Sequence, residues 1–173
     1  VVCRRQRQMC IRDSYIDGPV LEIENSSFIG LHPVPIVYGM TIGEYGKMIN
    51  GEGWLENKIK ADLEVIRIKN YNHNLKYEPP IRPSPNLPNL QSIYLYPSLA
   101  FLEKTEVSVG RGTKIQFQIY GHPNFISDFS FTPMPNFGSQ YPKLNGKLSF
   151  GEDLRNYKTK DCLLYTSPSP RDG

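Results

Sequence analysis

The order of helix and strand signals along the chain predicts an α/β fold. A helix signal at 41–51 precedes a strand signal at 61–71. A second helix signal starts at Leu90 and precedes strand signals at 106–110 and 115–121. Helices that alternate with strands are typical of α/β units. The length of 173 residues corresponds to one domain or to part of a larger one.

The helix at 41–51 is predicted from its capping signals and its apolar face. Thr41 and Glu44 have the spacing of a capping box, in which each side chain hydrogen-bonds to the backbone N–H of the other residue. Gly51 and Gly53 predict the end of the helix. The apolar residues that recur at helical spacing are Ile42, Tyr45, Met48 and Ile49.

A strand and then a stiff loop are predicted after this helix. The β-branched residues Val65, Ile66 and Ile68 favour an extended backbone within 61–71. Five prolines then fall between positions 79 and 88, close to apolar residues on both sides. Because each proline fixes its own backbone angle, this loop is expected to be stiff rather than disordered.

The second helix signal contains a proline at position 97. Either the helix kinks at Pro97, or a new helix begins there with proline in its first turn. Further along, Asn145 and Gly146 form a favoured two-residue turn and predict a β-hairpin in 141–150. The part of the chain after about residue 125 is richer in strand signals.

Both ends of the chain resemble translated sequencing-adapter read-through, as found at the edges of short metagenomic assemblies. They read "VVCRRQRQMCIRDS" at the start and "CLLYTSPSPRDG" at the end. We expect 1–14 and 161–173 to be disordered and foreign to the fold. The alternative is a natural basic arm and a natural tail. All three cysteines lie in the quoted ends, so no disulfide or thiolate–metal site is expected in the body.

The body between these ends is electrically neutral. The quoted ends hold five of the 20 basic residues and two of the 17 acidic residues, so the body carries equal numbers of each. A neutral body gives no electrostatic footprint for nucleic acid or for an anionic membrane surface. The chain also lacks a run of about 18 apolar residues, so we expect no membrane span.

Nucleotide and metal motifs do not match this sequence. The stretch "SVGRGT" at 108–113 lacks the spacing of a phosphate loop, and "GMTIGEYG" at 39–46 lacks that of a dinucleotide fingerprint. His32, His73 and His122 are too far apart in the sequence to suggest a metal site. We therefore expect neither a cofactor nor a metal.

Carboxylates remain as candidates for catalysis. Glycoside cleavage usually takes two of them, one as acid and one as base or nucleophile. Glu44 is a supporting candidate, although the capping box accounts for it without any catalytic role. The glutamates near loops and helix ends are Glu44, Glu52, Glu78 and Glu106.

Arg111 stands between two glycines, and two interpretations are open. Gly110 and Gly112 permit a left-handed backbone and a close approach of a ligand. A guanidinium can bind a carboxylate through two parallel hydrogen bonds, and Thr113 adds a hydroxyl. Alternatively, the stretch is a tight turn whose arginine pairs with a structural acid.

Four stretches occur together in one order along the body. They read "FIGLHPVPIVYGMTIGEYGKMINGEGWL", "PSPNLPNL", "YLYPSLAFLEKTEVSVGRGT" and "FTPMP". The ordered set closely resembles the exo-β-N-acetylmuramidase family, long known as a domain of unknown function. The resemblance covers roughly residues 17–157.

This resemblance implies a truncated fold. Family members join a Rossmann-like N-terminal domain to a smaller C-terminal domain, with the active site in the cleft between them. We therefore expect 15–124 to be the end of the Rossmann-like domain and the junction. Residues 125–160 would begin a smaller α+β or β-rich domain.

The resemblance also implies a function. Family members are bacterial glycoside hydrolases that release N-acetylmuramic acid from the non-reducing ends of peptidoglycan fragments, as in cell-wall recycling. Their proposed catalytic glutamates lie upstream of this chain, so the fragment by itself is expected to be inactive. We expect a muropeptide or another N-acetylmuramic acid saccharide as ligand, and a periplasmic or secreted location.

The substrate-binding candidates follow from the same resemblance. We expect Arg111 to bind the lactyl carboxylate of N-acetylmuramic acid, with the two neighbouring glycines clearing space. Asn86 contacts the sugar or caps the following helix. Tyr38 departs from the family, in which a histidine is expected before "GMT", so a proton-transfer role there is in doubt. The full candidate set is His32, Tyr38, Asn86, Gly110, Arg111, Gly112 and Thr113.

Two alternatives from other classes remain open. The chain is a non-catalytic module that binds peptidoglycan sugars, or a structural α/β domain whose loops pack on a partner. The oligomeric state is not indicated by the sequence.

Overall fold

The computed structural model describes residues 16–28, 30–73 and 78–157. The chain divides into two compact units, Val1–Tyr77 and Glu78–Gly173, which we call unit 1 and unit 2. The mixture of helices with small sheets confirms the predicted α/β class. The foreign-looking ends, 1–14 and 161–173, lie outside the described residues.

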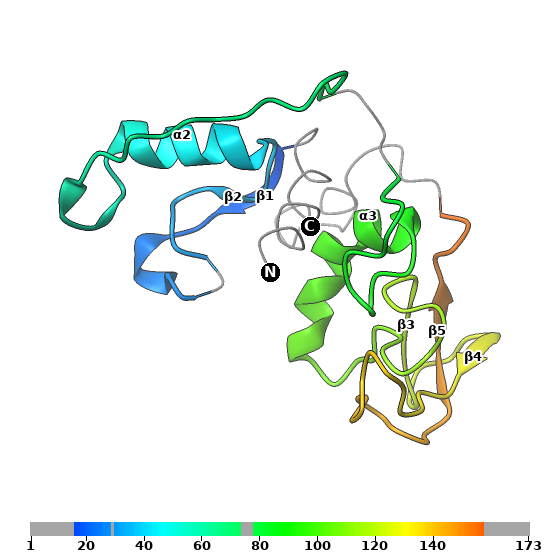
Figure 1. Ribbon diagram of the computed structural model, residues 1–173. Helices are drawn as coiled ribbons and strands as arrows, with labels where there is room; N and C mark the ends of the chain where they lie inside the picture. Colours follow the sequence, from blue (N-terminus) through cyan, green and yellow to red (C-terminus); the bar gives the residue numbers. More distant parts are fainter. Residues whose placement is uncertain (1–15, 29, 74–77, 158–173) are drawn as a thin grey trace. The chain divides into compact units, whose positions relative to one another are not determined.

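Unit 1 contains a two-stranded sheet followed by a helix (Figure 1). Strand β1 (Ile16–Val20) pairs antiparallel with β2 (Pro35–Tyr38), with Ile16 opposite Tyr38. A short 3-10 helix, η1 (Ile23–Asn25), lies between them in sequence. Only three residues separate the end of β2 from helix α2 (Ile42–Glu52). Another 3-10 turn, η2 (Glu56–Lys58), follows α2.

The predicted capping of α2 is confirmed. The Thr41 hydroxyl accepts a hydrogen bond from the backbone N–H of Glu44, and the Glu44 carboxylate accepts one from the backbone N–H of Thr41. Gly53 ends the helix in the left-handed conformation, with φ of 70°. These interactions, each within a few residues, mark the start and the end of the helix.

The predicted strand at 61–71 is wrong, because the backbone there has no regular secondary structure. The segment instead packs along α2, where Val65 lies against Gly43 and Leu63 lies near Gly46. The side chain of Asn50 fixes the start of the segment through hydrogen bonds of 2.8 and 2.9 Å to the backbone of Ala61. Within the described residues no strand pairs with it.

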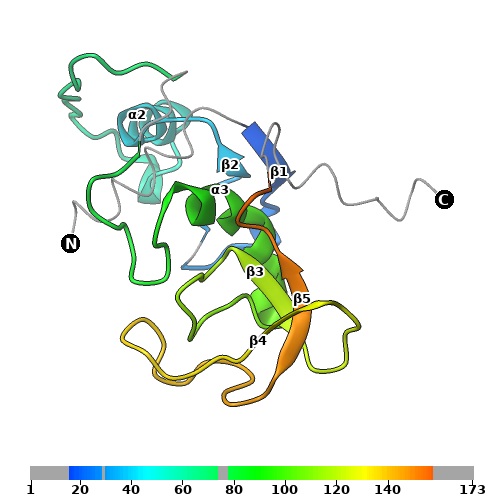
Figure 2. The ribbon, with the colours of Figure 1, turned by 90° about the vertical axis from the view of Figure 1, so that its right-hand side faces the viewer.

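Unit 2 contains a capped helix and a three-stranded antiparallel sheet. Helix α3 (Leu90–Leu99) holds Pro97 in its interior and continues into the 3-10 helix η3 (Ala100–Lys104). The sheet has the order β3-β5-β4, with β5 in the middle (Figure 1), and Figure 2 shows β3 and β5 side by side. The strands are β3 (Ile119–His122), β4 (Phe129–Phe131) and β5 (Ser149–Asp153).

Two sequence predictions for unit 2 need correction. The expected strand at 106–110 is reduced to one bridge, between Ser108 and Gly121. The predicted hairpin at 141–150 contains a turn, since the N–H of Lys147 donates to the carbonyl of Leu144 at 2.9 Å. That turn does not join two paired strands, because β5 pairs with the more distant β3 and β4.

Close backbone approach shapes the centre of this sheet. Gly121 of β3 stands opposite Gly151 of β5. A Cβ atom at Gly151 would lie 1.8 Å from the carbonyl oxygen of Tyr120, which is far inside van der Waals contact. The glycine at position 151 is therefore required by the pairing of β3 with β5.

The packed core lies in unit 2. Apart from Val37 of β2, every described buried apolar side chain belongs to this unit. These side chains come from α3, from β3 and from the loops around them: Leu87, Ile93, Leu95, Leu99, Val109, Phe117 and Ile119. Gln91 ties α3 to the end of the sheet by donating to the carbonyl of Leu154 at 2.9 Å.

The expected boundary between 124 and 125 stays a prediction. The pairing of β3 with β5 spans it, whereas the two compact units divide between Tyr77 and Glu78.

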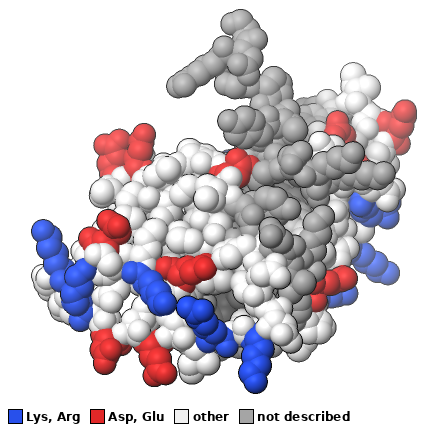
Figure 3. Space-filling view, turned by 90° about the horizontal axis from the view of Figure 1, so that it is seen from above, with Lys and Arg blue, Asp and Glu red and all other residues white. Residues whose placement is uncertain are grey.

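Within the parts of the chain that the structure describes, no helix is long and apolar enough to cross a membrane. On the face drawn in Figure 3, basic and acidic side chains are interspersed.

Candidate substrate-binding sites

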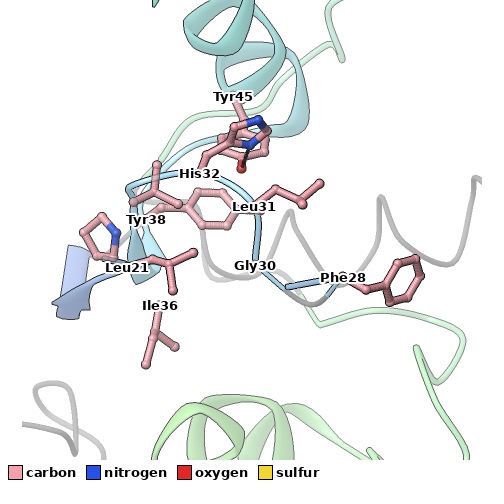
Figure 4. A pocket seen from close by; sticks show the side chains of 10 residues that line it. Leu21, Phe28, Gly30, Leu31, His32, Ile36, Tyr38 and Tyr45 are labelled. Atoms are coloured by element: carbon pink, nitrogen blue, oxygen red, sulfur yellow. Dashed lines mark hydrogen bonds between the residues drawn. The ribbon is translucent and has the colours of Figure 1, made fainter. Parts of the chain in front are cut away.

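Unit 1 contains a pocket of about 450 Å³ between the sheet, the loop before β2 and helix α2 (Figure 4). Most of its lining is apolar. The lining residues are Leu21, Phe28, Gly30, Leu31, His32, Val34, Pro35, Ile36, Tyr38 and Tyr45. Two of the predicted substrate-binding residues, His32 and Tyr38, are therefore brought together here.

Two aromatic side chains contact His32 in this region, and a third stacks on one of them. The His32 Nδ1 lies 2.7 Å from the hydroxyl oxygen of Tyr45, a hydrogen-bonding distance. The His32 ring stacks on Trp54, with ring centroids 5.5 Å apart and planes 15° apart. Tyr38 stacks in turn on Tyr45, with centroids 5.0 Å apart. Burial raises the pKa of the Tyr45 hydroxyl above its ordinary value.

The local sequence explains how these rings meet. Tyr38 is the last residue of β2, and Tyr45 lies in the first turn of α2, where its N–H donates to the carbonyl of Thr41. The short connection from β2 to α2 thus sets one tyrosine against the other. Trp54 follows the glycine that ends α2, and its N–H donates to the carbonyl of Ile49.

Glu44 lies next to Tyr45 but is engaged elsewhere. Its carboxylate accepts hydrogen bonds from the backbone N–H and the hydroxyl of Thr41, at 2.7 and 2.9 Å, and lies 3.0 Å from Nε2 of His73. Burial acts to raise the pKa of this carboxyl, but the bonds from Thr41 and His73 outweigh it and hold the pKa below its usual value. A carboxyl that stays ionised in this way suits helix capping better than proton donation.

In unit 2 the two glycines beside Arg111 are packed closely against other protein atoms, so that a Cβ added to either would collide with them. Gly110 and Gly112 have φ of 78° and 82°, in the left-handed region that glycine adopts readily. A Cβ at Gly110 would lie 2.6 Å from Ile119, and one at Gly112 would lie 2.6 Å from Pro142. Turn formation and packing thus account for both glycines. Thr113 closes the turn, because its hydroxyl donates to the carbonyl of Gly110 at 2.7 Å.

Arg111 pairs with an acidic residue of the protein, as one of the two interpretations of the sequence expects. Its Nε donates a hydrogen bond to the carboxylate of Glu103, and its guanidinium lies 5.0 Å from the ring centroid of Phe117. The arginine side chain remains 34% exposed. The ion pair therefore accounts for one edge of the guanidinium, and contact with a ligand carboxylate stays a prediction.

Asn86 is buried and does not cap the following helix. Its side-chain N–H donates to the carbonyl of Gly138 at 2.8 Å, and its side-chain oxygen has no hydrogen-bond partner among the described residues. The helix cap is Asn89, whose side-chain oxygen accepts from the backbone N–H of Ser92. The helix-capping alternative for Asn86 is thus wrong, and its contact with a sugar stays a prediction.

One loop links Asn86 to the turn that carries Arg111. The side chain of Asn136 donates to the carbonyl of Thr113 at 3.2 Å and accepts from the backbone N–H of Gly138. The seven predicted binding residues thus fall into two groups, one in each unit. His32 and Tyr38 form the first group. Asn86 and the turn 110–113 form the second.

Sequence reasoning missed the partners that hold these residues in place. The sequence predicts Tyr45 on the apolar face of its helix, and no motif marks Glu103 or Phe117 as partners of the binding residues. The sequence does contain a signal that Tyr45 lies near Tyr38. The two residues are seven positions apart, and only a short connection separates the strand from the helix that carry them. Among the described residues, no group of three or more His, Cys, Asp or Glu is placed to hold a metal ion.

An α/β chain with a pocket of this size, apolar walls and one polar pair is typical of proteins that bind a small molecule in a concave site. Two family models match the chain in succession. Exo-beta-N-acetylmuramidase NamZ, N-terminal, matches residues 6–91, and exo-beta-N-acetylmuramidase NamZ, C-terminal, matches residues 94–167. The chain belongs to this family, which confirms the resemblance seen in the sequence.

Individual relatives agree with the family models. The peptidoglycan beta-N-acetylmuramidase NamZ of Bacillus subtilis (strain 168) is 40% identical over 114 residues, which are 64% of this chain and 27% of the relative. A crystal structure of a DUF1343 family protein from Bacteroides fragilis matches with a TM-score of 0.83 and 47% sequence identity. The match covers 86% of this chain and 42% of the chain in that structure. A second such protein from that organism, 22% identical with a TM-score of 0.70, shares the fold. The chain thus spans less than half the length of these relatives.

Proposed function

We propose that the protein to which this chain belongs is an exo-acting glycoside hydrolase that releases N-acetylmuramic acid from the non-reducing ends of peptidoglycan fragments. The observation that carries this proposal is the match of two successive family models to nearly the whole chain. The B. subtilis relative is named as a peptidoglycan beta-N-acetylmuramidase, and its similarity extends over 64% of this chain.

Within that enzyme, this chain contributes to substrate binding rather than to bond cleavage. Glycoside cleavage needs an acid and a base or nucleophile, usually two carboxylates. The carboxylate of Glu44, the supporting catalytic candidate from the sequence, is engaged by Thr41 and His73. The 173 residues alone are therefore inactive in this proposal, and the catalytic glutamates belong to the part of the family fold that lies upstream.

The substrate of the enzyme is an N-acetylmuramic acid saccharide, such as a muropeptide. Its lactyl ether carries a carboxylate that distinguishes it from N-acetylglucosamine. The part of the Arg111 side chain that remains exposed is a candidate for this carboxylate, while its Nε is held by Glu103. A periplasmic or secreted location fits a substrate that comes from the cell wall.

A chimera tests the proposed function. Residues 16–157 would replace the corresponding segment of the B. subtilis relative, and release of N-acetylmuramic acid from the non-reducing end of peptidoglycan fragments would be measured. We expect the chimera to release the sugar and the 173-residue chain alone to release none. A chimera that folds but is inactive, beside an active parent, would contradict the proposal.

A second candidate is a non-catalytic module that binds peptidoglycan sugars. The engagement of Glu44 in helix capping favours it, since no catalytic role is then assigned within the described residues. The gene sequence upstream of the chain separates the two candidates, because a preceding Rossmann-like half with paired acidic residues would favour the enzyme.

A further inference from the structure

The pocket of unit 1 has one polar pair at one end and apolar walls elsewhere. Figure 4 shows Tyr45 and His32 at one end, Leu21 and Ile36 toward the other, and Tyr38 between them. We propose that the Tyr45 hydroxyl is a recognition group of this pocket, which hydrogen-bonds to a sugar ring whose apolar face lies on the pocket walls. This inference rests on the proposed function and adds a residue and a ligand orientation to it.

The Tyr45 hydroxyl is held in place from two sides. His32 Nδ1 lies 2.7 Å from its oxygen, and the ring of Tyr45 is stacked against Tyr38. His32 is itself fixed by stacking on Trp54. Because each ring is held by another, the hydroxyl is positioned before a ligand arrives, which reduces the entropy lost on binding.

The hydroxyl retains capacity for a ligand. A phenol offers one donor and two acceptor lone pairs, and the imidazole nitrogen takes at most one of these. Burial raises the pKa of the Tyr45 hydroxyl, so the group keeps its proton throughout the neutral range. A sugar hydroxyl can therefore donate to the Tyr45 oxygen while His32 stays bound.

The pocket fits a sugar ring better than a purely apolar ligand. Its volume of about 450 Å³ lies in the usual range for small-molecule sites. A pyranose presents C–H groups on its face and hydroxyls on its edge, which matches apolar walls with a polar pair at one end. An acyl chain would fill the walls but would leave the remaining hydrogen-bonding capacity of the Tyr45 hydroxyl unused.

A single-atom change tests the inference. Tyr45→Phe removes the hydroxyl and keeps the ring that stacks on Tyr38. Tyr120→Phe, in β3 of unit 2, is the matched control, because burial also raises the pKa of the Tyr120 hydroxyl. Binding of N-acetylmuramic acid and of N-acetylglucosamine to the 173-residue chain would be measured by NMR titration, with circular dichroism as a check on folding.

We expect Tyr45→Phe to weaken binding of N-acetylmuramic acid about 2- to 10-fold, the effect of one lost hydrogen bond. The control should bind like the parent chain. Equal affinities for the parent and Tyr45→Phe would overturn the inference, as would failure of the parent chain to bind either sugar. Neither result bears on the chimera, so failure of the recognition group and failure of the proposed function are distinguishable.

Discussion

Arg111 is the residue at which a structural role and a ligand role can be separated. Its pairing with Glu103 joins the turn 110–113 to helix η3, and its guanidinium also lies over Phe117. Both partners lie in unit 2 and require no ligand. The remaining exposure of the side chain leaves room for a carboxylate on the solvent side.

Replacing Arg111 by alanine tests both roles. Loss of a partly exposed ion pair and of a cation–π contact should lower the free energy of unfolding by about 1 kcal/mol, measured by urea denaturation. Glu103→Gln, which keeps the size of the partner, should lower the free energy of unfolding by less than Arg111→Ala does. If Arg111 also binds the lactyl carboxylate, the chimera carrying Arg111→Ala should lose its preference for muramic over glucosamine substrates. An unchanged preference would leave Arg111 with the structural role alone.

The sequence raised both roles but could not choose between them, since Glu103 is eight positions away and belongs to no recognisable pattern. Tyr45 shows the same limit. Its spacing predicts a helix face, whereas its hydrogen bond with His32 depends on the loop that precedes β2. Residue-level function thus depends on contacts between distant segments, which spacing alone does not reveal.

At the scale of elements, local signals were the reliable ones. Helix α2 begins and ends where its capping box and its glycine predict, because those interactions lie within a few residues. The expected strand at 61–71 failed because a strand requires a partner, and β-branched residues report only an extended backbone. The turn at Asn145 and Gly146 formed, but the pairing of β5 was decided by distant segments.

The cap of α2 should make this helix sensitive to acid. The folded-state pKa of Glu44 lies below its ordinary value of 4.5, so its contribution to stability is present above that value and is lost as the pH falls through the folded pKa. Glu44→Gln should therefore destabilise α2 at neutral pH and make little difference in strong acid.

Helix-specific amide exchange between pH 3 and pH 7 would measure this effect. Glu52→Gln is the control, because Glu52 is exposed at the other end of the same helix. The difference in amide exchange of α2 between Glu44→Gln and the parent should shrink as the pH falls. A difference that stays constant with pH would show that the ionised carboxylate is not what stabilises the cap.

At the scale of the whole molecule, the two units differ in how well they are packed. Unit 2 holds nearly all of the described buried apolar side chains, and both units expose several large apolar side chains. Ile66 and Ile68 are 88% and 70% exposed on the segment that runs along α2. Exposed apolar patches of this kind favour association.

The family membership could be predicted from the sequence, because four ordered stretches identified it.

The 173-residue chain is therefore expected to self-associate through exposed apolar side chains, Ile66 and Ile68 among them. Replacing Ile66 and Ile68 by threonine should reduce association, measured by light scattering, without lowering the melting temperature. Val65→Thr is the matched control, since Val65 packs against Gly43 and its loss should destabilise the chain without improving solubility. A parent chain that is monodisperse and melts cooperatively would contradict this expectation.

The close approach of the Tyr120 carbonyl to Gly151 limits which residues position 151 can accept. Even alanine at that position would force β3 and β5 apart, and the damage would extend to every residue paired across them. In a saturation library selected for folded protein, codon 151 should accept glycine alone, while the exposed turn at Gly146 should tolerate asparagine.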